Sequence, residues 1–100
     1  MDNNSKYTRY VILINRKKDY TTDVINMHVG HLKRLDKNGQ LILCGPFKDY
    51  GGGLVIIKAE SIEEAKIIAK SDPFITKGFS VYELRTLQLA DKENHYFLNS

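Results

Sequence analysis

The segment from Tyr7 to Asn15 is apolar on both of its faces, and this feature constrains the fold of the chain more than any other. Its β-branched and aromatic residues are typical of a β-strand. Because alternate side chains of a strand point to opposite faces, Val11 and Leu13 lie on one face, and Ile12 and Ile14 lie on the other. A sheet built around such a strand needs apolar cover on both sides.

The other apolar runs predict two helices and three further strands around this segment. A Ser61-x-x-Glu64 capping box starts the second helix, and Pro73 ends it because proline forces the preceding Asp72 away from helical geometry. The predicted elements, in chain order, are a strand at Tyr7 to Asn15, a helix from Thr21 or Thr22 to about Lys37, strands at Gln40 to Cys44 and Leu54 to Ala59, a helix from Ser61 to about Lys70, and a strand at Phe79 to Leu87.

This β-α-β-β-α-β order is that of the ferredoxin-like α+β fold, in which four strands form one antiparallel sheet and both helices cover one face. The strands Gln40 to Cys44 and Leu54 to Ala59 are also apolar on both faces. The uncovered face would therefore be an unusually large exposed apolar patch. A second copy packed sheet to sheet removes this exposure, so we predict a homodimer.

Length and composition restrict the class of protein. The chain has 100 residues, the length of one domain, with 42% hydrophobic and 27% charged residues. These values exclude a disordered or low-complexity protein. A net charge of +3 does not require a nucleic acid or an anionic membrane as partner. We treat residues 1–100 as a single domain.

The sequence also indicates where the protein is located. Its first six residues are polar, and no apolar run approaches the roughly 20 residues that cross a bilayer. The single cysteine, Cys44, cannot form an internal disulfide or a cysteine-rich zinc site. Because it lies within a predicted strand, we expect a buried and inert thiol. These features predict a soluble protein of the reducing cytoplasm with no membrane partner.

Two histidines lie on the apolar stripe of the first predicted helix instead of on its solvent face. Each is either a core or groove residue with a satisfied hydrogen bond, or an acid–base group that faces a cleft. A zinc site at His28 and His31 has no third ligand apparent in the sequence, so we predict no metal. At about 100° per residue, one arc of the helix holds Val24, His28, His31, Leu32 and Leu35.

Three loop motifs have both a structural and a functional interpretation. Gly45-Pro46 and Gly51-Gly52-Gly53 either form turns or bring bare backbone close to a small anionic or carbonyl-bearing ligand. The glycines match neither a dinucleotide-binding nor a P-loop pattern, because no helix follows them. Asp72-Pro73-Phe74 by itself indicates a helix-terminating turn in which the aspartate accepts local backbone hydrogen bonds.

Taken in order, several short motifs resemble the YciI-like (YCII-related) family over residues 7–87. The polar tail, residues 88–100, lies beyond this core. Its cluster from Asn94 to Phe97 either folds back over a cleft or a dimer seam, or ends the chain as a frayed terminus. The matching motifs are His31-Leu32-x-x-Leu35, Gly39-x-Leu41, Gly45-Pro46-Phe47, Gly52-Gly53, Ser61-x-Glu63-Glu64-Ala65 and Asp72-Pro73-Phe74-x-x-x-Gly78.

The resemblance implies a ferredoxin-like domain that dimerises through its sheets as a dimeric α+β barrel. It also implies that His31 and Asp72 are the paired histidine and aspartate of the family, close together in a cleft beside the glycine-proline turn. His28 matches no part of the family pattern, and we interpret it as structural. The residues expected to bind substrate are Gly45, Pro46, Gly52, Gly53 and Phe74.

The function that the resemblance implies is that of a cofactor-independent lyase or isomerase acting on a small oxygenated compound. His31 is the predicted general base, and Asp72 accepts the other ring N–H, which fixes the tautomer and stabilises the imidazolium. The alternative is a non-catalytic module of the same fold that binds a metabolite or a protein, since no second acid, nucleophile or metal set accompanies the pair.

RNA binding is a third class, because RNA-recognition motifs share this order of elements. Those modules stack bases on aromatic residues of the first and third strands. The third predicted strand, Leu54 to Ala59, contains no aromatic residue. We therefore predict no nucleic-acid partner.

Overall fold

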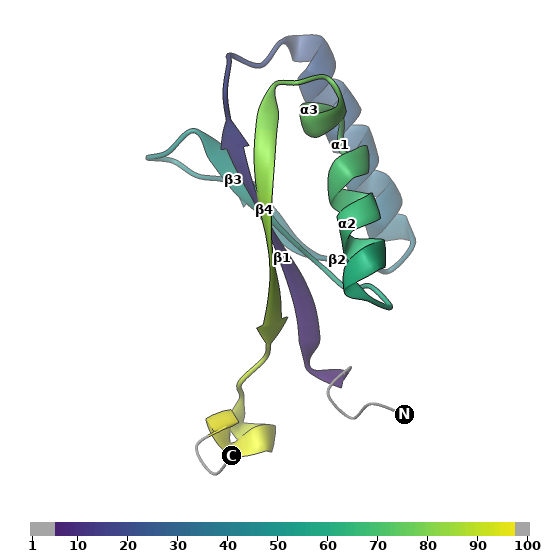
Figure 1. Ribbon diagram of the computed structural model, residues 1–100, viewed down its shortest axis with the longest axis vertical. Coiled ribbons are helices and arrows are strands. Elements are labelled where there is room, and N and C mark those ends of the chain that lie inside the picture. Colours follow the sequence, from purple (N-terminus) through teal and green to yellow (C-terminus); the bar gives the residue numbers. More distant parts are fainter. Residues whose placement is uncertain (1–5, 98–100) are drawn as a thin grey trace.

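A four-stranded antiparallel sheet with helices on one face forms the body of the protein (Figure 1). The computed structural model describes residues 6–97, and this architecture confirms the predicted α+β class. The strands lie in the order β2-β3-β1-β4. The elements are β1 (Thr8–Arg16), α1 (Thr22–Lys37), β2 (Leu41–Pro46), β3 (Gly52–Ile57), α2 (Ile62–Ser71), α3 (Pro73–Thr76), β4 (Ser80–Gln88) and the 3-10 segment η2 (Lys92–Phe97).

Both long helices begin at side chains that accept backbone hydrogen bonds. Thr21 Oγ1 accepts from the Val24 N–H over 3.1 Å at the start of α1. Ser61 Oγ accepts from the Glu64 N–H over 3.1 Å at the start of α2. The Glu64 carboxylate in turn accepts from the N–H of Glu60, over 2.8 Å. These caps satisfy amides that have no partner inside a helix, which explains why the helices start here.

Four segments differ from the sequence prediction. Strand β2 continues through Gly45 to Pro46, which were predicted to form a turn after Cys44. The turn at Asp72 continues into the short helix α3, because Pro73 suits the first helical position and Asp72 caps it. Strand β3 begins at Gly52, so part of the expected glycine loop belongs to the sheet. The tail contains η2, in which His95 and Tyr96 adopt positive φ angles. Figure 1 shows η2 beyond the end of the sheet that lies opposite α3.

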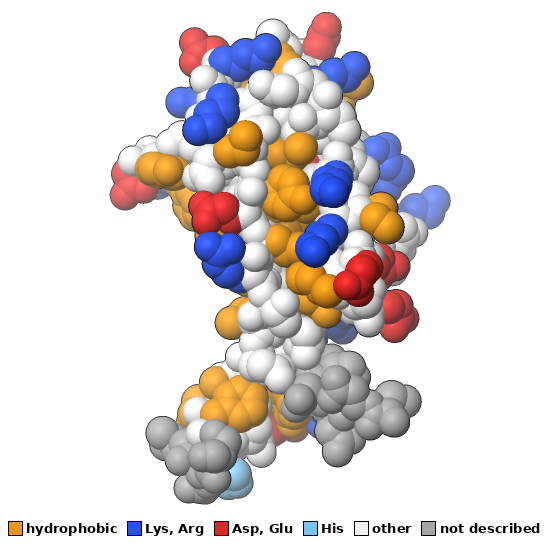
Figure 2. All heavy atoms as spheres, viewed as in Figure 1, with side chains coloured by type: hydrophobic (Ala, Val, Ile, Leu, Met, Phe, Trp, Pro, Cys, Tyr) orange, Lys and Arg blue, Asp and Glu red, His pale blue; other side chains and the backbone are white. Residues whose placement is uncertain are grey.

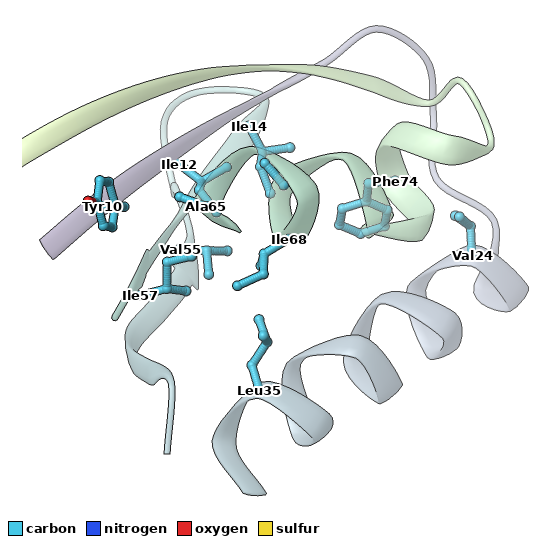
Figure 3. Packing of buried hydrophobic residues seen from close by; sticks show 11 residues of the cluster. Tyr10, Ile12, Ile14, Val24, Leu35, Val55, Ile57, Ala65, Ile68 and Phe74 are labelled. Carbon is cyan, nitrogen blue, oxygen red and sulfur yellow. The ribbon is translucent and has the colours of Figure 1, made fainter. Parts of the chain in front are cut away.

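The hydrophobic core lies between the helices and the sheet face that carries the even-numbered residues of β1. Figure 3 shows side chains from β1, β3, α1 and α2 directed toward one another across this layer. The alternation predicted for the first strand is therefore observed. The buried hydrophobic residues are Tyr10, Ile12, Ile14, Val24, Leu35, Val55, Ile57, Ala65, Ile68, Ala69 and Phe74.

The opposite sheet face carries apolar side chains that no helix of residues 6–97 covers (Figure 1). Val11 is half-buried, and the strand register places Ile56 and then Leu43 beside it on this face. Leu43 of β2 and Val81 of β4 have 51% and 48% of their surface exposed. We call this the open sheet face.

Charged side chains of both signs are interspersed over the surface that Figure 2 shows, with no patch of a single sign. This distribution agrees with the small net charge of +3. Within residues 6–97, no helix combines the length and the apolar character needed to span a bilayer.

Gly52 is required by close backbone contact, and its substitution tests the geometry of the β2–β3 end of the sheet. Its φ is +135°, and an added Cβ would lie 1.9 Å from the carbonyl oxygen of Ile14. We expect Gly52→Ala to lower the free energy of unfolding by about 2 kcal/mol or more, measured by urea denaturation. In Gly45→Ala the added Cβ meets nothing within 4 Å, so this control should change stability by less than about 1 kcal/mol. Equal losses in the two variants would contradict the described packing.

Candidate functional site

A cavity of about 460 Å³ lies between α1 and the sheet, where β2 ends and β3 begins. Helix α1 contributes the apolar side chains of Ile25, Val29 and Leu32, together with the imidazole of His28. The cavity is lined by all five residues predicted to bind substrate, whose role in binding remains a prediction: Gly45, Pro46, Gly52, Gly53 and Phe74.

Cys44 also lines this cavity and is exposed, so the prediction of a buried thiol is wrong. The physical reason is the position of β2 at the edge of the sheet, where a side chain has neighbours on one side only. Among the described residues 6–97, no group of three His, Cys, Asp or Glu side chains could hold a metal ion.

His28, and not His31, forms a hydrogen bond with Asp72. The Nδ1 atom of His28 lies 2.9 Å from both carboxylate oxygens of Asp72. Both side chains are largely withdrawn from solvent, with 14% of the His28 and 4% of the Asp72 side-chain surface exposed. The pair joins α1 to the junction between α2 and α3. Helix α1 and this junction are far apart in the sequence.

The position of Asp72 follows from its role at a helix junction. Its extended backbone ends α2, and its side chain caps α3 by accepting from the Phe74 N–H over 2.9 Å at Oδ1. The local hydrogen bond expected from the Asp72-Pro73-Phe74 motif is therefore present. The same carboxylate has enough acceptor capacity to bind His28 as well. One buried side chain thus stabilises a helix start and orients an imidazole.

The contact with Asp72 determines which nitrogen of His28 carries the proton in the neutral ring. An ionised carboxylate only accepts hydrogen bonds, so the Nδ1–H of His28 donates to it. The Nε2 atom is then left without a hydrogen and can accept a proton. His28 lines the cavity, so an imidazole with a ring nitrogen able to accept a proton belongs to its wall.

Aromatic rings pack against this imidazole. The Phe74 ring stacks on His28 with a centroid separation of 3.9 Å and an interplanar angle of 12°. On its other side, Phe74 stacks on Tyr20 at 3.9 Å and 7°. Phe74 and Tyr20 both line the cavity, so the wall beside the base is aromatic.

His31 occupies a different environment from the one the resemblance implied. It is buried, with 7% of its surface exposed, and its ring makes no hydrogen bond to Asp72. Burial lowers the pKa of His31 below its usual value of 6.5, and the Asp72 charge only partly opposes this effect. Electrostatic interactions with neighbouring His28 and with the Arg34 guanidinium lower the pKa further. The hydrogen bond predicted between His31 and Asp72 is thus formed by His28 instead, and a catalytic role of His31 and Asp72 stays a prediction.

The sequence pattern places His28 on the apolar stripe of the helix, but it places His31 there too. It therefore does not indicate which of the two histidines contacts Asp72. Residues three apart lie on neighbouring positions of one helix face, so periodicity places His28 and His31 in the same arc. Which of them meets Asp72 depends on how α1 packs against α3. That packing comes from tertiary structure, which a helical pattern does not contain.

The lowered pKa of His31 predicts a pH dependence of stability. In the unfolded chain His31 takes up a proton near pH 6.5, whereas in the folded protein it stays neutral to a lower pH. Below this value the unfolded state binds more protons, so stability decreases as the pH falls toward the folded-state pKa. We expect His31→Gln to show a smaller loss of unfolding free energy between about pH 7.5 and about pH 5 than the wild type, measured by urea denaturation.

The control for this prediction is His95→Gln, because His95 is exposed and lies on η2. This variant should lose stability in parallel with the wild type over the same pH range. A wild-type slope in His31→Gln would show that His31 titrates alike in the folded and unfolded states.

Comparisons with known proteins agree with this fold. The profile of the YCII-related domain matches residues 8–88. The chain is 32% identical over 80 residues to the uncharacterized protein YjpA of Bacillus subtilis, which covers 80% of this chain and 94% of that protein. The structure is similar to that of the 5-chloro-2-hydroxyhydroquinone dehydrochlorinase TftG of Burkholderia phenoliruptrix AC1100 in complex with 2,5-dihydroxybenzoquinone.

That similarity has a TM-score of 0.65 and covers 85% of this chain and 97% of the other, at 21% sequence identity. At 21% identity, the similarity between the two structures shows a shared fold and nothing more. The profile match and the similarity to YjpA are sufficient to assign the family. The chain belongs to the YCII-related domain family.

Proposed function

We propose that the protein is a small-molecule enzyme in which His28, oriented by Asp72, removes a proton from a compound held in the cavity. One observation carries this proposal. The imidazole that lines the cavity has its Nδ1 atom 2.9 Å from both oxygens of a buried carboxylate. This arrangement leaves Nε2 as the base. The resemblance gave the base role to His31, and the experiment below separates the two assignments.

The proposed reaction class is a cofactor-independent elimination or isomerisation. His28 Nε2 takes a proton from a carbon next to an oxygenated carbon, and the C–H electron pair stays on the substrate. In an elimination this pair expels a leaving group, and in an isomerisation it moves to a neighbouring bond while the proton returns elsewhere. The imidazolium that forms lies beside Asp72, whose charge stabilises it in surroundings with little water.

We assign substrate binding to the wall formed by the glycine segments and Phe74. The glycines present backbone without side chains, so a flat ring can approach the sheet closely. The aromatic ring of Phe74 offers a stacking surface beside His28. The remainder of the wall, which includes Ile25 and Val29, is apolar and favours a compound with few charges.

The similar structure supports this substrate class. It is named as a dehydrochlorinase of a chlorinated hydroxyhydroquinone and was solved with a dihydroxybenzoquinone. Dehydrochlorination is an elimination, and both compounds are small oxygenated rings. The proton transfer proposed here uses an imidazole and a carboxylate and needs no cofactor. The exposed thiol of Cys44 suits a reducing compartment, in agreement with the predicted cytoplasmic location.

Proton abstraction can be measured before the natural substrate is identified. We would incubate the protein in D₂O with a panel of quinols and hydroxyquinones, including 5-chloro-2-hydroxyhydroquinone. Exchange of ring protons is followed by NMR and release of chloride by an ion-selective electrode. We expect catalysed exchange or elimination, reduced roughly 10²–10⁴-fold in His28→Gln because a positioned base contributes about this factor. Asp72→Asn should reduce the rate as well, since the tautomer of His28 is then no longer fixed.

The matched control is His31→Gln, which changes the neighbouring histidine on the same helix. Retained activity in His31→Gln together with loss in His28→Gln supports the proposed assignment. The opposite pattern restores His31 as the base. A compound that binds to the wild type and remains unaltered over hours in every assay favours the alternative function, a non-catalytic module that binds a metabolite.

We further propose that two copies of the chain associate through the open sheet face. The half-buried Val11 and the half-exposed Leu43 and Val81 are unusual on a solvent-facing surface. A copy of the same face is equally apolar, and a two-fold axis between the sheets covers both at once. This is the dimeric α+β barrel implied by the family resemblance.

Charge substitution on the open sheet face tests this association. Sedimentation equilibrium should give twice the mass of one chain for the wild type and a monomer, or a much weaker dimer, for Val81→Glu. Ile67→Glu is the control, because Ile67 is 68% exposed on α2, on the helical side of the sheet. A wild-type protein of single-chain mass at micromolar concentration would contradict the proposed dimer.

A further inference from the structure

We propose that Tyr20 and Ser80 are positioning residues for His28 and act on it through the ring of Phe74. Neither residue belongs to a motif of the sequence analysis. The proposal rests on the proposed function for its effect on turnover, but its effect on the imidazole itself is measurable without a substrate.

Three rings form a continuous column beside the cavity. Tyr20 and Phe74 are nearly parallel, with an interplanar angle of 7° and centroids 3.9 Å apart. Phe74 and His28 follow with 12° and 3.9 Å. The plane of each ring therefore limits the plane of the next, from Tyr20 before α1, through Phe74 of α3, to His28 of α1.

The outer end of this column is anchored by polar contacts. The hydroxyl of Tyr20 lies 2.7 Å from the hydroxyl of Ser80, which is buried with 4% of its surface exposed. The backbone N–H of Lys17, three residues before Tyr20, donates to the carbonyl of Phe79 over 2.8 Å. The ring of Phe79 also meets that of Tyr20 edge to face, with centroids 6.2 Å apart. Tyr20 is thus held by the start of β4, outside the catalytic pair.

The hydrogen bond to Asp72 does not by itself fix the orientation of the His28 ring. The torsion that rotates a histidine ring about its Cβ–Cγ bond is broad, so a single hydrogen bond does not fix the ring plane. Asp72 fixes the position of Nδ1, and the stack on Phe74 fixes the plane in which the ring lies. Together these two contacts fix the orientation of the His28 ring, and with it the direction of Nε2. Without the stack, the ring can leave Asp72 and exchange the proton between its nitrogens.

Ser80 allows positioning to be separated from contact with a ligand. Tyr20 and Phe74 line the cavity, whereas Ser80 does not. An effect of Ser80 on His28 therefore does not arise from contact with a compound in the cavity, and the Tyr20 hydroxyl and the stacked rings are the route that we propose for it. Ser80→Ala and Tyr20→Phe remove the same hydrogen bond from its two ends and should act alike.

The experiment measures the ring ¹⁵N chemical shifts of the histidines in the uniformly labelled full chain, at a pH where the rings are neutral. In the wild type, His28 should show a protonated Nδ1 and a bare Nε2, while exposed His95 shows the tautomer mixture of a free imidazole. In Tyr20→Leu the two shifts of His28 should move toward those of His95. Ser80→Ala and Tyr20→Phe should give a smaller shift in the same direction. Ile57→Val, a fully buried substitution outside the column, is the control and should leave His28 unchanged.

Unchanged His28 shifts in Ser80→Ala and Tyr20→Phe would overturn the proposal even where Tyr20→Leu fails to fold, because these two variants lose only a hydroxyl. Shifts that respond to Asp72→Asn but to no variant of the column overturn the positioning role and leave the proposed function intact. If the His28 shifts are unchanged in Asp72→Asn, the pairing of His28 with Asp72, on which the proposed function depends, is overturned. If a compound that the enzyme converts is found, Ser80→Ala should lower kcat several-fold with KM unchanged, since Ser80 itself does not line the cavity.

Discussion

The buried carboxylate of Asp72 is the interaction on which the rest of the site depends. The extended backbone of Asp72 ends α2, while its carboxylate caps α3 through the Phe74 N–H and accepts the Nδ1–H of His28 from α1. A buried charge is costly unless it is paired and hydrogen-bonded, so these contacts are needed together. Since each of them fixes a different helix, the carboxylate couples the packing of the helical layer to the orientation of the proposed base.

The two faces of the sheet have different physical roles. One face is covered by the helices, and the cavity forms where this layer separates from the sheet near the glycines of β3. The open sheet face is apolar without a cover from residues 6–97, which supports the proposed association of two copies. A substitution in β1 therefore acts on a different process according to the parity of its number. The even positions Tyr10, Ile12 and Ile14 belong to the core, whereas odd positions such as Val11 lie on the open sheet face, where a substitution would act on the proposed association.

Sequence reasoning predicted the parts of the structure that local chemistry determines. The alternation around Ile12 indicates strand β1 and its buried face, and Thr21 and Ser61 mark the starts of both long helices. The start of β3 was displaced because Gly52 joins the sheet through a close approach to the backbone of β1. The histidine that contacts Asp72 was missed for a related reason. Both candidates satisfy the helical period, and only the approach of α3 selects His28.

The close approach of the β3 backbone to β2 limits how the shape of the cavity can be changed by substitution. An added Cβ at Gly53 would lie 2.6 Å from the Gly45 carbonyl oxygen, so no side chain can be introduced at this position of the cavity wall without rebuilding the sheet. The wall formed by α1 is different, since Ile25 and Val29 are partly exposed side chains on one face of a helix. For the proposed enzyme, substitutions at these two helix positions would therefore change the shape of the cavity while Gly53 and the proposed base stay in place.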